Sequence, residues 1–64
     1  VVKLQDLSPD NEGVKIVLQN QSDLPTAASI TLNDRTFTSP ELPPWRLLRF
    51  RLAGAEFIEL RDLT

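Results

Sequence analysis

Apolar and polar residues alternate along several short stretches of the chain, and this two-residue period is typical of half-buried β-strands. Five prolines, at positions 9, 25, 40, 43 and 44, leave few runs long enough for an ordinary helix. The sequence predicts six strands, over residues 1–7, 14–19, 27–32, 35–38, 45–52 and 56–60. The end of the chain also fits a short helical tail. This pattern predicts one all-β domain over residues 1–64, either a small antiparallel β-sandwich of the immunoglobulin-like kind or a partly closed barrel.

The clearest turn signal in the chain is the pair Asn33-Asp34, which separates two alternating stretches. Asn and Asp tolerate the positive φ angles that a two-residue type I′ hairpin turn requires at both central positions. Such a turn places Ile30 opposite Phe37 and gathers Ser and Thr side chains on the other face of the hairpin. A register slip of one residue would destroy this sorting of faces. We therefore expect a tight hairpin over residues 29–38.

The last two predicted strands are joined by Ala53-Gly54-Ala55, which fits a three-residue turn. With a loop of this length, opposite charges and large apolar side chains face one another across the strands, and such pairs are stabilising. The expected partners are Phe50 with Ile58, Leu48 with Leu60, Arg49 with Glu59, and Arg46 with Asp62.

A chain of 64 residues buries only about 60% of the surface that its unfolded form exposes. The chain has no Cys and no His, so neither a disulfide nor a typical zinc site can stabilise it. Its stability must come from packing or from a partner surface. Because the sequence also starts at Val1 and contains no Met, we expect a domain of a longer protein. The predicted core consists of Ile16, Leu18, Ile30, Phe37, Leu48 and Phe50.

Residue types that commonly carry catalysis are missing from the chain. It contains no His, Cys or Tyr, and its two glycines cannot form a phosphate-binding loop. Most of the carboxylates fall in turns or at strand ends, where solvation and turn chemistry explain them. Asp10-Asn11-Glu12 could offer oxygen ligands to calcium, but the spacing of a calcium loop is absent. We expect no enzyme activity, no metal and no cofactor.

Charge and hydropathy limit the partners. The formal net charge of −2 argues against nucleic acid, and no apolar run approaches the roughly 20 residues needed to cross a membrane. Asn20-Gln21-Ser22 matches the pattern for N-glycosylation, although this tripeptide often occurs by chance. Nothing else indicates a secretory route, so the compartment stays open, with an intracellular location slightly favoured.

An aromatic and basic stripe, Trp45, Leu47, Arg49 and Arg51, alternates along the predicted fifth strand. Trp and Arg are enriched at interface hot spots, so we interpret the stripe as a partner interface. The partner would be the rest of a parent polypeptide or another protein. Stacking on a sugar is conceivable, but only arginine donors lie beside the ring, and one ring is too few for single-stranded nucleic acid. The alternative is an ordinary solvent face, with Trp45 packed on its prolines and Arg49 paired with Glu59.

Two segments resemble the terminal β-domains of glycoside hydrolases. Residues 13–22 with Pro25 and residues 27–32 form a strand, a polar turn and a second alternating strand. Residues 42–52, Leu-Pro-Pro-Trp-Arg-Leu-Leu-Arg-Phe-Arg-Leu, resemble the closing strand of such domains in the retaining α-mannosidases of the lysosomal and Golgi class. The resemblance implies a non-catalytic accessory domain that packs against the catalytic part of a carbohydrate-processing enzyme. The other class that we keep open is a free-standing small β-barrel that serves as an interaction module or assembly subunit.

Overall fold

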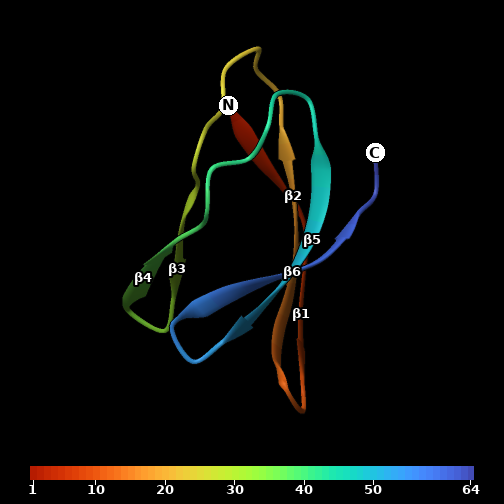
Figure 1. Ribbon diagram of the computed structural model, residues 1–64. Coiled ribbons are helices and arrows are strands. Elements are labelled where there is room, and N and C mark those ends of the chain that lie inside the picture. The colour runs from red at the N-terminus through yellow and green to blue at the C-terminus, as the bar shows by residue number, and fades with distance from the viewer.

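The computed structural model describes all residues, 1–64, and consists of six antiparallel strands without a helix. Four strands form one sheet in the order β1-β2-β5-β6, and β3 pairs with β4 in a separate two-stranded sheet (Figure 1). Because the strands divide into two separate sheets and β1 and β6 are free edges, the fold is the predicted small β-sandwich and not a closed barrel. The strands are β1 (Val2–Asp10), β2 (Gly13–Asn20), β3 (Ser29–Leu32), β4 (Arg35–Thr38), β5 (Leu47–Ala53) and β6 (Glu56–Asp62).

The hairpin of β3 and β4 has the predicted turn and register. Asn33 and Asp34 have φ angles of 51° and 63°, which the type I′ turn requires at both positions. Ile30 pairs with Phe37, and on the opposite face the hydroxyl groups of Thr31 and Thr36 lie 3.1 Å apart. The prediction for this hairpin is confirmed.

The core lies between the hairpin and the two middle strands of the larger sheet. Five of the six predicted core residues are buried, and the exception is Phe37, which is only partly buried because it lines a shallow surface hollow. Phe57 meets Phe50 edge to face, with ring centroids 5.9 Å apart. Two residues of the core cluster, Leu42 and Leu52, are not among those predicted. The full cluster is Ile16, Leu18, Ile30, Leu42, Leu48, Phe50 and Leu52.

The first hairpin of the chain is longer than predicted. β1 continues through Pro9 to Asp10, so the turn before β2 is only two residues long. Proline is tolerated there because β1 is an edge strand, whose outer side needs no N–H donor. A β-bulge at Gln5 shifts the register by one residue, and it thereby turns Leu7 toward the same face as Val2.

The register of β5 and β6 differs from the prediction by one residue beside the turn and by two residues beyond a bulge. Ala53 pairs with Glu56, so the turn has two residues and not three. Gly54 has a φ of 64° at the first central position, which is the glycine position of a type II′ turn. Phe50 therefore faces Glu59, and a bulge at Leu60 separates this pair from the next pairs along the strands.

The sixth strand is confirmed and is two residues longer than predicted, since residues 56–62 form a strand and not the alternative helical tail. The start of the fifth strand needs correction. β5 begins at Leu47, two residues later than predicted, because the preceding residues form a turn in which the Arg46 N–H donates to the Pro43 carbonyl at 3.3 Å.

Candidate docking surface

The larger sheet has an inner face, which carries the core, and a face turned away from the β3–β4 hairpin that we call the outer face. Cross-strand pairing and strand alternation place three of the four predicted interface residues on the outer face. Leu47, Arg49 and Arg51 alternate with the buried Leu48, Phe50 and Leu52 of β5 and so point outward. The outer face consists of Lys3, Asp6, Ser8, Lys15, Val17, Gln19, Leu47, Arg49, Arg51, Ile58 and Arg61.

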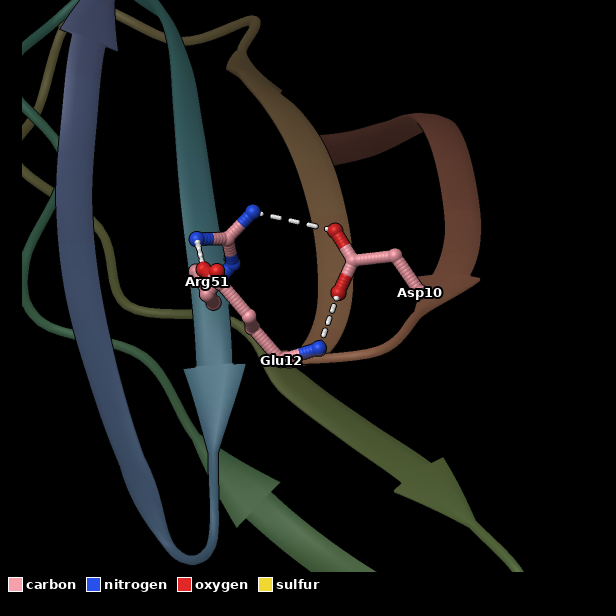
Figure 2. Close-up of polar contacts among 3 residues, drawn as sticks. All are labelled: Asp10, Glu12 and Arg51. Atoms are coloured by element: carbon pink, nitrogen blue, oxygen red, sulfur yellow. Dashed lines mark hydrogen bonds and ion pairs between the residues drawn. The ribbon is translucent and has the colours of Figure 1, made fainter.

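Arg51 is held by two carboxylates of the β1–β2 turn. Its Nη2 donates to Oδ2 of Asp10 at 3.0 Å, and its Nη1 donates to Oε2 of Glu12 (Figure 2). The Glu12 N–H donates to Oδ1 of Asp10 at 2.9 Å, and this bond, followed by the charge of Arg51, holds the pKa of Asp10 below its ordinary value of 3.8. The acidic turn that offered a calcium alternative is thus engaged with an arginine. Of the predicted stripe, Arg51 has its charge already matched within the domain.

Arg49 has no such partner. The predicted ion pair with Glu59 is absent, because the observed register places Arg61 directly opposite Arg49. Neither arginine has a carboxylate within ion-pair distance, and the same holds for Lys15, which lies in the next row of β2. Like charges directly opposite across strands are destabilising. The centre of the outer face therefore carries two arginines that the domain itself does not pair, whereas the charge of Lys15 helps to lower the pKa of Asp10 without a direct ion pair.

Trp45 lies in the turn before β5 and is 58% exposed. Pro44 and Trp45 are the central residues of this turn, which the hydrogen bond between Arg46 and Pro43 closes. The φ angle of Trp45 is 59°, the left-handed region that glycine favours at this position of a type II turn. A bulky side chain rarely adopts this conformation, which costs of order 1–3 kcal/mol. Trp45 is thus displayed to solvent from a strained backbone and is not part of the strand.

The turn that carries Trp45 is anchored by Asn20, which is fully buried. Its side-chain Nδ2 donates to the carbonyls of Leu24 (2.8 Å), Leu42 (3.0 Å) and Pro43 (3.3 Å). Its Oδ1 accepts from the hydroxyl of Ser22 at 2.8 Å. The Asn-x-Ser tripeptide that matched the glycosylation pattern is therefore a structural element, because the amide that would carry a glycan is enclosed in the domain.

One shallow hollow lies at the opposite end of the sandwich, near the β3–β4 and β5–β6 turns. Its volume is about 260 Å³, and its apolar lining comes from Val14, Leu32, Phe37 and Leu52. The Arg35 guanidinium lies over the Phe37 ring, 5.4 Å from the ring centre. None of the four predicted interface residues lines this hollow.

No group of three or more acidic side chains lies close enough together to hold a metal ion. The chain forms no helix with the length and apolar character needed to cross a membrane. In comparisons with known proteins, no family model, no curated protein and no solved structure matches this chain.

Proposed function

We propose that this chain is a non-catalytic β-sandwich domain that docks onto a protein. Its contact surface would consist of Trp45 and the outward-facing residues at the start of β5. The surface runs from Trp45 through Leu47 to Arg49. The docked protein is the rest of a parent polypeptide or a separate subunit.

The observation that carries this proposal is the exposed Trp45 on a left-handed backbone. Within the domain, glycine at this position would relieve the strain, and a mostly exposed indole gains little from the domain's own packing. Tryptophan is the residue type that contributes most often to interface hot spots. A large aromatic kept at a local cost therefore favours a contact outside the domain over a role within it. Sugar stacking would use the same ring, but the neighbouring side chains offer few hydrogen-bonding groups other than arginine.

The parent that we propose is a carbohydrate-processing enzyme of the α-mannosidase kind, and the support for it is the resemblance of residues 13–32 and 42–52 to terminal β-domains. The incomplete cover of the larger sheet favours an accessory domain more generally. A two-stranded sheet covers a four-stranded one, and Leu4 on β1 and Leu60 on β6 are 47% and 41% exposed. A free-standing module would more typically close its core on all sides.

Site-specific photo-cross-linking at position 45 tests the docking proposal. A photoreactive phenylalanine analogue in place of Trp45 keeps an aromatic side chain at the site, and a matched control carries the same analogue at Leu24, which is 66% exposed in another loop. We expect position 45, and not position 24, to cross-link to a defined protein segment outside residues 1–64, as mapped by mass spectrometry. Replacing Leu47 with Ser should lower that yield. Equal and scattered products at both positions would contradict docking through Trp45.

A further inference from the structure

We infer that the partner of the outer face is an acidic protein segment whose carboxylates bind between Arg49 and Arg61, with Lys15 beside them. This inference rests on the proposed docking function and specifies the chemistry of the partner.

The juxtaposition of Arg49 and Arg61 follows from the register of β5 and β6. The two-residue turn at Gly54 and the bulge at Leu60 together set Arg49 opposite Arg61. With the three-residue turn that the sequence suggested, Arg49 would have faced Glu59, and its charge would have been matched. The observed register instead turns Glu59 to the inner side, opposite Phe50.

The residues around Arg49 and Arg61 do not neutralise the two charges, which favours an anion that a molecule outside the domain supplies. Arg49 is flanked on β2 by Val17, an apolar residue that is only 8% exposed, so no neighbour on that side neutralises it. Asp6 lies beyond Val17 on β1, where the Ser8 hydroxyl contacts its carboxylate at 3.3 Å. Arg49 and Arg61, which pair directly opposite each other, both offer guanidinium N–H donors on the outer face. A carboxylate placed between them would accept charge-assisted hydrogen bonds and remove the repulsion.

The distribution of charge favours a protein over a nucleic acid. Five of the seven cationic side chains, Lys3, Lys15, Arg49, Arg51 and Arg61, lie on the outer face. Four carboxylates, Asp6, Asp10, Glu12 and Glu56, lie on or at the rim of the same face. A long polyanion would meet these rim carboxylates, whereas a short acidic segment fits between them. Apolar Leu47 and Ile58, interleaved with the arginines, also suit a polypeptide.

A titration of the isotope-labelled chain, followed by amide NMR shifts, tests this inference. The probes are a short oligoglutamate peptide, an oligolysine peptide of the same length, and a single-stranded oligothymidine of similar charge. We expect oligoglutamate alone to shift amides of Lys15, Val17, Arg49 and Arg61, and the shifts should weaken as salt is added. Shifts that are produced mainly by oligothymidine, or that spread over both sheets, would overturn the inference.

Single substitutions of the two arginines distinguish a role in binding the acidic partner from a role in the stability of the domain. Arg49→Gln and Arg61→Gln should each weaken oligoglutamate binding about two- to fivefold, as expected for the loss of one exposed ion pair. Arg35→Gln, an exposed arginine on the other sheet, is the matched control and should have no effect. Because the pair is repulsive, Arg61→Gln should leave the unfolding midpoint unchanged or raise it. A lowered midpoint would show that the pair is structural and would overturn the inference. If position 45 cross-links to a defined protein segment while both variants bind oligoglutamate normally, the docking proposal is supported and the proposal of an acidic partner is rejected.

Discussion

Asn20→Ala tests whether one buried side chain holds the loops that carry the candidate docking surface. Asn20 is fully buried, and its amide group ties the end of β2 to Leu24, Leu42 and Pro43. Alanine removes the two N–H donors that the three carbonyls share, together with the bond accepted from Ser22. It leaves a small cavity in their place.

The expected loss of stability depends on whether the carbonyls that Asn20 contacts keep other hydrogen bonds. The Leu42 carbonyl still accepts the Thr26 N–H at 3.1 Å, and the Pro43 carbonyl still accepts from Arg46, so neither is left without a partner. Each lost bond then costs about 0.5–1 kcal/mol, at the lower end of the usual range. With the cavity, the free energy of unfolding should fall by about 2–4 kcal/mol. For a domain of this size that corresponds to a melting temperature lower by about 10–30 °C.

Thermal unfolding followed by far-UV circular dichroism measures this effect. The matched control is Gln21→Ala, an exposed neighbouring amide that bonds only the Gln19 side chain, and it should change stability by less than about 0.5 kcal/mol. Asn20→Asp is a sharper second variant, because the new carboxylate faces three carbonyl oxygens and burial raises its pKa. The folded form of that variant then binds the extra proton, so its stability should recover as the pH falls. An Asn20→Ala variant as stable as Gln21→Ala would refute the anchoring role.

Three other predictions concern the sheet and its termini. Gly13→Ala should destabilise by about 1–3 kcal/mol or more in a denaturant titration, because the added Cβ would overlap the Leu52 carbonyl oxygen at a φ of 138°; an unchanged midpoint would contradict this packing. Phe50→Ala should cost about 3–5 kcal/mol and leave little folded domain at 37 °C, whereas a variant with nearly unchanged melting would place the core elsewhere. The pKa values of Asp10 and Asp62 are lowered from 3.8, mainly by backbone N–H donors, so the unfolded chain binds more protons and stability should fall as the pH drops below 3.8. Asp62→Asn should flatten that acid-side slope, and an equally steep slope would exclude the contribution of Asp62.

Local signals in the sequence account for the parts of the fold that were predicted correctly. At Asn33-Asp34, the turn chemistry and the alternation of faces require the same register, so the hairpin could be read from ten residues. The sequence near Gly54 is less specific. Ala53-Gly54-Ala55 fits a two-residue or a three-residue turn, and the glycine preference of the type II′ turn was the signal that could have separated them. The length of this turn, together with the bulge at Leu60, decides whether Arg49 lies opposite Glu59 or Arg61.

Non-local features could not be read from the pattern. Leu42 lies among prolines without periodicity, and its burial depends on a bridge to Thr26, sixteen residues earlier. Asn20 looked like a loop residue, and only the approach of the turn at Pro43 gives its amide partners. The bulges at Gln5 and Leu60 have no signature in the alternation. The sequence therefore predicted which residues form the candidate surface. It could not predict which of their charges are paired, because the pairing depends on contacts between distant segments.

The measurement that tests the central claim most directly is the stability of Trp45→Gly. Trp45 is the only tryptophan, so the denaturant titration is followed by far-UV circular dichroism and not by fluorescence. If the indole serves a contact outside the domain, glycine relieves the backbone strain, and the free energy of unfolding stays within about 0.5 kcal/mol of the parent chain or rises. A decrease of about 2 kcal/mol or more would show that Trp45 is packed into the domain, and this result would contradict its role in docking.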